Sequence, residues 1–178
     1  MRAEGLNFWF KEIEQKQWWV KSLDFDQQIR EKFGKLHASA NACELYEWRA
    51  SPVGRLAEII VLDQFSRNMF RDKPEAFASD TLALALAQEA IAVGDDLPLN
   101  ETQRCFIYMP FMHSESLKIH DKALDLFKEN CPESNFNFEV KHRDIIKQFG
   151  RYPHRNSILG RSSTEEELAF LKQPGSSF

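Results

Sequence analysis

The residues most able to do chemistry gather in one twenty-residue stretch, 142–161. It holds two histidines and five lysine or arginine side chains against a single acid, Asp144. Gly150, Pro153 and Gly160 shape the backbone there, and six large apolar residues would tie the stretch to a hydrophobic interior. A solvated basic tail would not need those apolar residues. The pattern therefore predicts a folded, cationic, turn-rich segment that holds an anion or a network of carboxylates.

Polar groups in two earlier segments extend the candidate site. Asp63 follows a very apolar run, and a buried carboxylate needs a partner, for which Arg67 four residues later is the local candidate. A second polar segment begins at His113. We expect these groups to meet in one cationic pocket that binds a small anionic ligand. The predicted ligand-binding residues are Asp63, Arg67, Asn68, Arg71, His113, Glu115, His142, Arg151, His154, Arg155, Asn156 and Arg161.

The same residues have a structural interpretation that the sequence leaves open. The planar guanidinium of arginine binds carboxylates as well as phosphates. Internal salt bridges to Asp63, Glu115 and Asp144 therefore explain the arginines equally well. A general base oriented by His113 is one interpretation of Glu115. An acid at the start of a helix, where it complements the helix dipole, is the simpler one. His113 and Glu115 are therefore weak candidates for catalysis, and whether the protein is an enzyme stays open.

The spacing of histidines and cysteines argues against a metal site. His113 and His120 are seven residues apart, which on a helix separates them by about 10 Å. Cys43, Cys105 and Cys131 form no CxxC pair, which disfavours both structural zinc and a disulfide framework. We predict no metal and no cofactor, and we expect three free thiols in a reducing cytosol.

Composition limits the class of protein and its partners. The chain has 178 residues, of which 43% are hydrophobic, enough for one domain with its own core. A net charge of -4 argues against general binding to nucleic acid. The first fifteen residues lack an apolar run of signal-peptide length, and the longest apolar runs elsewhere are too short to cross a bilayer. We expect a soluble cytoplasmic protein without nucleic-acid or membrane partners.

Helix signals are frequent, and no segment has convincing strand signals. Ser51 followed by Pro52 predicts the start of a central, mostly buried helix that reaches Phe65. A break is predicted at Gly34, and an end or kink at Pro110. The other predicted helices lie at about 3–11, 24–33, 36–48, 81–93, 101–110, 115–131, 136–149 and 164–171. Asp80 and Ser114 are predicted to cap two of them, and capping boxes are predicted at Asn100 with Gln103 and within 163–167. We therefore predict a single all-α domain over 1–171, with about eight helices in antiparallel hairpins, and a flexible tail over 172–178.

Four long motifs resemble the bacterial domain of unknown function 924 family. They are GRLAEIIVLDQFSRNMFR, AFASDTLALALAQEAIAVGDD, RCFIYMPFMHSES and HRDIIKQFGRYPHRNSILGRSSTEEELAFL, and the resemblance covers residues 6–171. It implies an irregular, right-handed, tetratricopeptide-like array of helix hairpins, and it implies no particular activity. The family pattern usually has glutamine where His120 stands, which further weakens this histidine as a metal ligand. The tetratricopeptide likeness makes a protein- or peptide-interaction module the alternative function.

Overall fold

The computed structural model describes residues 2–177, and the burial of side chains over 4–177. Its helices are α1 Arg2–Asn7, α2 Leu23–Asn41, α3 Pro52–Ile60, α4 Ser66–Met69, α5 Asp80–Ala92, α6 Glu101–Met112, α7 Leu117–Asn130, α8 Glu133–Phe149 and α9 Glu165–Phe170. A π-helical turn, Val61–Phe65, joins α3 to α4 without a break. If this continuous stretch is counted once, the described residues form eight helices and no strand. The all-α prediction is confirmed.

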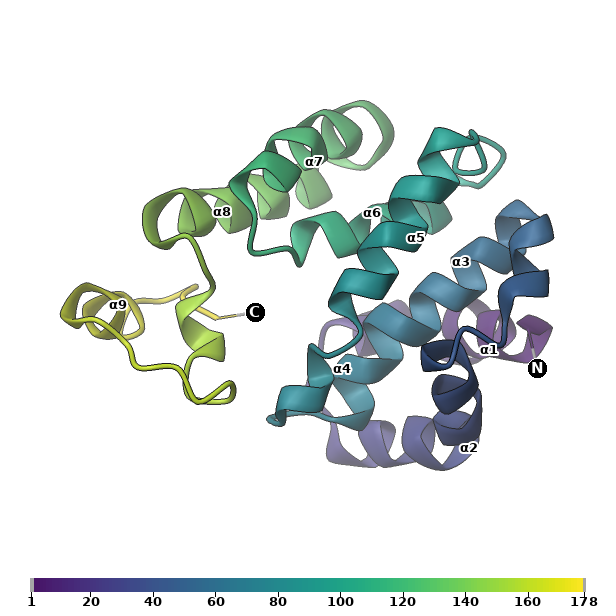
Figure 1. The fold of residues 1–178 in the computed structure, drawn as a ribbon, viewed down its shortest axis with the longest axis horizontal. Helices are drawn as coiled ribbons and strands as arrows, with labels where there is room; N and C mark the ends of the chain where they lie inside the picture. The colour runs from purple at the N-terminus through teal and green to yellow at the C-terminus, as the bar shows by residue number, and fades with distance from the viewer. Residues whose placement is uncertain (1, 178) are drawn as a thin grey trace.

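The continuous helix from Pro52 to Met69 lies at the centre of the molecule. Its α3 part packs against α1, α5 and α6, and its α4 part packs against α2. Farther along the chain, α6, α7 and α8 pack against one another (Figure 1). None of the described helices is long and apolar enough to cross a membrane.

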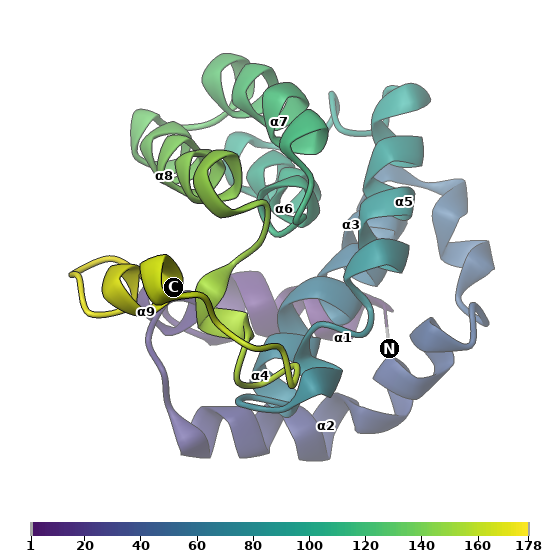
Figure 2. The same cartoon turned by 60° about the vertical axis from the view of Figure 1, so that its left-hand side comes forward.

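The chain between α8 and α9, residues 150–164, turns back toward α4 and α5. We call it the returning segment. Gly150 ends α8 with a φ of 70°, a left-handed conformation that glycine adopts without strain. The chain then runs between α8 and the end of α4, as two views of the ribbon show (Figures 1 and 2). This return brings the cationic stretch of the sequence against α4 and α5.

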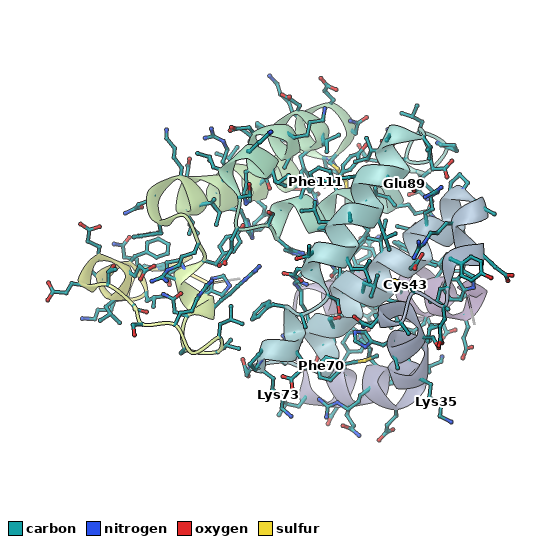
Figure 3. All side chains as sticks on the ribbon, in the orientation of Figure 1. Lys35, Cys43, Phe70, Lys73, Glu89 and Phe111 are labelled. Atoms are coloured by element: carbon teal, nitrogen blue, oxygen red, sulfur yellow. A yellow bond between two sulfur atoms is a disulfide. The ribbon has the colours of Figure 1, made fainter. Side chains whose placement is uncertain are left out.

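The core consists mainly of large apolar side chains from α1 to α7. Phe8, Trp9, Phe33 and Phe65 pack ring against ring, and each is at most 2% exposed. Charged groups such as Lys35 and Lys73 lie on the outside (Figure 3).

Three predicted helix starts are confirmed by their caps. The Ser51 hydroxyl accepts a hydrogen bond from the backbone N–H of Gly54, and Pro52 is the first residue of α3. Asn100 with Gln103, and Thr164 with Glu167, form reciprocal capping boxes at the starts of α6 and α9.

Other predicted boundaries are wrong. Helix α2 continues through Gly34 without a break, because the apolar residues before and after this glycine are buried on one face of the helix. Helix α6 continues through Pro110 to Met112, and all three residues from 110 to 112 are buried by the helices around them. Ser116, not Ser114, precedes α7, and Ser79 rather than Asp80 precedes α5.

The prediction of three free thiols is wrong. Cys105 in α6 and Cys131 just after α7 form a disulfide, with their Cα atoms 5.8 Å apart. The antiparallel packing of α6 and α7 brings these two positions together, which their spacing in the sequence did not reveal. Cys43 is an exposed free thiol. With two cysteines paired, free thiols no longer support the assignment to a reducing compartment.

Candidate functional site

The site begins at the π-helical turn, where Asp63 is fully buried. A π-helical turn inserts one extra residue into an α-helix and often marks a functional position. Asp63 uses one carboxylate oxygen to accept a hydrogen bond from the Nε2 of Gln64 at 2.6 Å. The other oxygen lies 2.7 Å from Nδ1 of His113 and 3.1 Å from Nη1 of Arg67. The predicted pair Asp63–Arg67 is therefore confirmed, with His113 as a third member.

Arg67 links Asp63 to a second carboxylate that the sequence did not mark as part of the site. Its Nη1 and Nη2 donate to the two oxygens of Asp80, at 2.9 and 3.0 Å. Asp80 is the first residue of α5, so this bidentate pair ties the start of α5 to α4.

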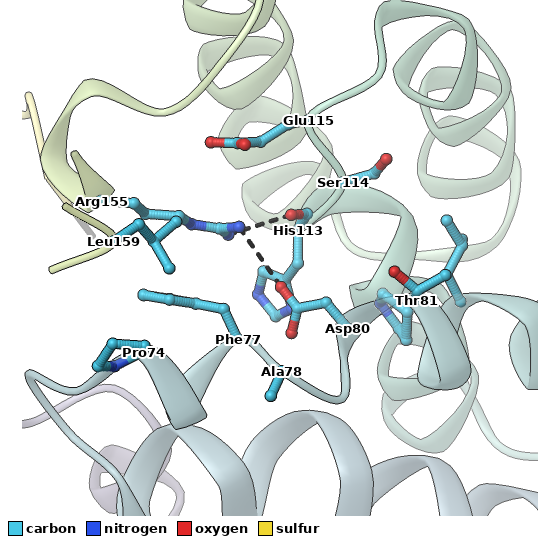
Figure 4. A pocket seen from close by; sticks show the side chains of 12 residues that line it. Pro74, Phe77, Ala78, Asp80, Thr81, His113, Ser114, Glu115, Arg155 and Leu159 are labelled. Atoms are coloured by element: carbon cyan, nitrogen blue, oxygen red, sulfur yellow. Dashed lines mark hydrogen bonds and ion pairs between the residues drawn. The ribbon is translucent and has the colours of Figure 1, made fainter. Parts of the chain in front are cut away.

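Arg155 approaches the same carboxylate from the returning segment. Its guanidinium lies 4.5 Å from the ring centres of both Phe77 and Tyr152. Nη2 donates to the backbone oxygen of His113 at 3.0 Å, and Nη1 lies at a longer 3.4 Å from Asp80 Oδ2 (Figure 4). Nε is buried and has no hydrogen-bond partner among the described residues. Arg155 is thus a buried cation whose donors are only partly used.

Glu115 fixes the loop between α6 and α7 to the returning segment. Its two oxygens accept from Nη1 and Nη2 of Arg161 at 2.6 and 2.8 Å, and one of them also accepts from the backbone N–H of Tyr152. The favoured interpretation of Glu115 as a first-turn acid of a helix is wrong, because α7 begins only at Leu117.

His120 supports this loop from inside the protein. Its Nε2 donates to the backbone oxygen of Ser114 at 2.8 Å, and its Nδ1 lies 2.7 Å from Oε1 of Glu139. Both side chains are fully buried. Burial raises the pKa of Glu139 above its ordinary value. His120 is therefore a structural group that positions the loop carrying His113 to Glu115.

A cavity of about 310 Å³ opens between α5, the end of α6 and the returning segment. Figure 4 shows Arg155 pointing into the space between Glu115, His113 and Asp80. The lining contains both apolar and polar side chains, so the cavity suits a small molecule with both characters. The lining residues are Pro74, Phe77, Ala78, Asp80, Thr81, Leu84, Pro110, His113, Ser114, Glu115, Arg155 and Leu159.

The protonation states of the three central groups follow from their surroundings. Burial alone would raise the pKa of Asp63, but the charge of Arg67 and the hydrogen bond from His113 lower it to about 2. Burial, and then the charge of Arg67, lower the pKa of His113. At neutral pH, Asp63 is therefore ionised and His113 is neutral.

The pKa values of Arg155 and Glu115 are both lowered, each for its own reason. Burial, and then the charge of Arg67, lower the pKa of Arg155 below its ordinary value. Burial would raise the pKa of Glu115, but the hydrogen bonds from Arg161 and from the Tyr152 backbone lower it. The lowered pKa of Arg155 reflects a buried cation that its neighbours stabilise incompletely.

The structure brings together seven residues, which we call the polar network. They are Asp63, Arg67, Asp80, His113, Glu115, Arg155 and Arg161. Because three carboxylates face three arginines, this network is balanced rather than cationic as predicted. Among the described residues, no three histidine, cysteine or acidic side chains are grouped closely enough to hold a metal ion.

Of the predicted site residues, only His113, Glu115 and Arg155 are among the described residues that line the cavity. Asn68 and Arg71 both bind the buried Asp26 of α2. Arg151 and Asn156 bind Glu167 and so fix α9 to the returning segment.

The last two predicted histidines flank one aromatic side chain. The rings of His142 and His154 lie 5.8 and 5.5 Å from the ring of Tyr152. Burial lowers the pKa of these two histidines, to about 3 and about 4 respectively. Both are therefore neutral at physiological pH, and neither lines the cavity.

Two residues of the site were missed in the sequence. Asp80 resembled a helix cap, and the only signal that it does more was its place within a family-like motif. Phe77 lies in the same motif but was not recognised, because its contact with Arg155 joins positions 78 residues apart.

Comparisons with known proteins agree with this fold. A solved structure described as a protein of unknown function, ATU0120 from Agrobacterium tumefaciens, matches with a TM-score of 0.91 and 37% identity, over 96% of each chain. No protein with a curated description matches the chain. The family model for a bacterial protein of unknown function, DUF924, matches residues 6–175. The chain therefore belongs to the DUF924 family.

Proposed function

We propose that the protein binds a small anionic ligand, a carboxylate or a phosphate, in the cavity at Arg155. The observation that carries this proposal is the buried guanidinium of Arg155, whose Nε has no partner among the described residues. Asp80, its nearest carboxylate, already accepts two hydrogen bonds from Arg67 and lies at the longer distance of 3.4 Å. An anion in the cavity would complete the pairing of this cation.

The surroundings of Arg155 also favour a small ligand over a peptide. Aromatic rings lie over the guanidinium, so its N–H edge is the part left to bind an anion. A volume of about 310 Å³ is at the small end of ordinary ligand sites. Leu84, Pro110 and Leu159 would contact a short apolar part of the ligand. The peptide-binding alternative would need a longer open groove, and this geometry supports it less well.

Calorimetry and thermal shift with a panel of short carboxylates and phosphate monoesters test the proposal. We expect at least one compound to bind, with affinity reduced roughly 10- to 100-fold in Arg155→Gln, because a hydrogen-bonded ion pair is lost. The matched control is Arg143→Gln, which removes an arginine paired with Asp121 outside the cavity. Equal affinity in Arg155→Gln and wild type, or no binding across the panel, would contradict the proposal.

A further inference from the structure

His113 has one ring nitrogen committed to the protein and one facing the cavity. Nδ1 lies 2.7 Å from the buried carboxylate of Asp63. The side chain is 15% exposed and lines the cavity. No hydrogen bond to its Nε2 is found among the described residues. The ring is therefore anchored on one side and available on the other.

The anchoring also determines which nitrogen carries the proton. Asp63 is ionised, because Arg67 lies 3.1 Å away and the pKa of Asp63 is lowered to about 2. An ionised carboxylate only accepts hydrogen bonds, so Nδ1 must be the protonated nitrogen of the neutral imidazole. Nε2 then carries a lone pair directed away from Asp63. This carboxylate–imidazole arrangement is one that enzymes use to orient a general base.

The anion site and this nitrogen belong to the same corner of the cavity. Arg155 Nη2 donates to the backbone oxygen of His113 itself, at 3.0 Å. A short ligand held by Arg155 therefore reaches the imidazole without a long spacer. Arg67, Asp80, Arg155 and Glu115 are further charged groups close to His113.

We propose that His113, oriented by Asp63, is the proton acceptor of the cavity, and that its ligands are small hydroxy-substituted carboxylic acids. This inference rests on the proposed function, because Arg155 holds the carboxylate of the ligand. The hydroxyl group donates its hydrogen bond to Nε2. When the proton transfers, it moves from the hydroxyl oxygen to Nε2, the electron pair stays on that oxygen, and the imidazolium faces the carboxylate of Asp63.

Matched ligand pairs separate this inference from the proposed function. The pairs are lactate with propionate and 3-hydroxybutyrate with butyrate, measured by calorimetry. In wild type we expect the hydroxy acid of at least one pair to bind roughly two- to ten-fold more tightly, the gain from one hydrogen bond. In His113→Asn the amide can still donate to Asp63 from the Nδ1 position, but nothing replaces Nε2, so the two members should bind equally. Arg155→Gln should weaken both members alike.

The outcomes point to different conclusions. Equal binding within both pairs in wild type, or a preference that persists in His113→Asn, overturns the inference and leaves the proposed function standing. If none of these acids binds, the ligand class is overturned, and the remaining part of the inference, the orientation of His113 as proton acceptor, is decided on the ligand-free protein by nitrogen-15 NMR of the histidine rings at pH 8. His113 is assigned by its absence from His113→Asn, and the Nδ1–H tautomer supports the inference. The Nε2–H tautomer overturns it.

Discussion

At the scale of single residues, Asp80 is the carboxylate that the buried Arg155 and the partly buried Arg67 share. Arg67 holds it with two short hydrogen bonds, and Arg155 reaches it only at 3.4 Å. One carboxylate cannot give two guanidinium groups ideal geometry at once. Asp80 therefore links both arginines, and under the proposed function its longer contact with Arg155 leaves that guanidinium able to bind a further anion.

Replacement of Asp80 by Asn should change stability and ligand affinity in opposite directions. Chemical denaturation should show a loss of about 3 kcal/mol, because two largely buried cations lose their carboxylate. Affinity for an anionic ligand should rise, because Arg155 then has one competitor fewer. The control is Asp121→Asn, whose side chain is 56% exposed and whose loss should change stability by less than about 1 kcal/mol. If anion affinity falls together with stability in Asp80→Asn, Asp80 is itself part of the ligand-binding surface.

The buried histidine His142 should make the protein sensitive to mild acid. Burial lowers its pKa to about 3, whereas in the unfolded chain it titrates near 6.5. Between these values the unfolded state binds more protons, so the free energy of unfolding falls as pH decreases below about 6.5. Each such histidine contributes about 1.4 kcal/mol per pH unit.

Urea unfolding at pH 6 and pH 5 tests this dependence. In His142→Phe the difference in free energy of unfolding between the two pH values should shrink by about 1.4 kcal/mol. Asp63 does not interfere, because its lowered pKa affects stability only below about pH 4. An unchanged difference would show that His142 is already protonated, or already exposed, in the native state.

At the scale of helices, Gly54 in α3 and Gly34 in α2 differ in how much space surrounds them. A Cβ atom on Gly54 would lie 1.8 Å from the backbone oxygen of Trp48, so the chain approaches α3 too closely for any side chain. A Cβ atom on Gly34 would meet nothing within 4 Å. Glycine at position 54 therefore allows the backbone at Trp48 to pack directly against the first turn of α3.

Alanine at these two positions should therefore have opposite effects on stability. Gly54→Ala should lower the free energy of unfolding by about 3 kcal/mol or more, because backbone must move to relieve the collision. Gly34→Ala should raise it by roughly 0.5–1 kcal/mol, since alanine favours a helix interior. Denaturation curves of both variants decide the matter, and a destabilised Gly34→Ala would mean that α2 does break at this glycine.

Local signals predicted the helices well wherever chain and cap residues alone decide the structure. Ser51 with Pro52, Asn100 with Gln103, and Thr164 with Glu167 act within one turn, and each was confirmed. The predicted break at Gly34 and the predicted helix end at Pro110 are absent, because tertiary packing overrides the local preference against glycine and proline inside a helix. The π-helical turn at Val61–Phe65 was not predicted, because the apolar pattern of the central helix continues through it without a break.

At the scale of the whole molecule, the convergence of three segments could be predicted but not its detail. Buried charge next to apolar helices implied that Asp63, His113 and Arg155 would meet, and the structure brings them together. Which arginine of the returning segment faces the cavity depends on the turn after Gly150. Arg151 and Arg155 look alike in the sequence, yet the first binds Glu167 and the second lines the cavity.

The disulfide is the other long-range feature that spacing did not reveal, and it should stabilise the whole fold. Cys105 and Cys131 are 26 residues apart, so loop closure in the unfolded chain corresponds to about 3–4 kcal/mol. Reduction with a thiol reagent, or the double change Cys105→Ser with Cys131→Ser, should lower the free energy of unfolding by this amount. Cys43→Ser should not, because Cys43 is a free thiol on the surface.

A thiol assay tests the bond itself. Denaturant without reductant leaves a disulfide intact, so the unfolded chain should show one thiol before reduction and three after it. A count of three before reduction would show that the pair is not bonded, and stability should then be indifferent to reductant.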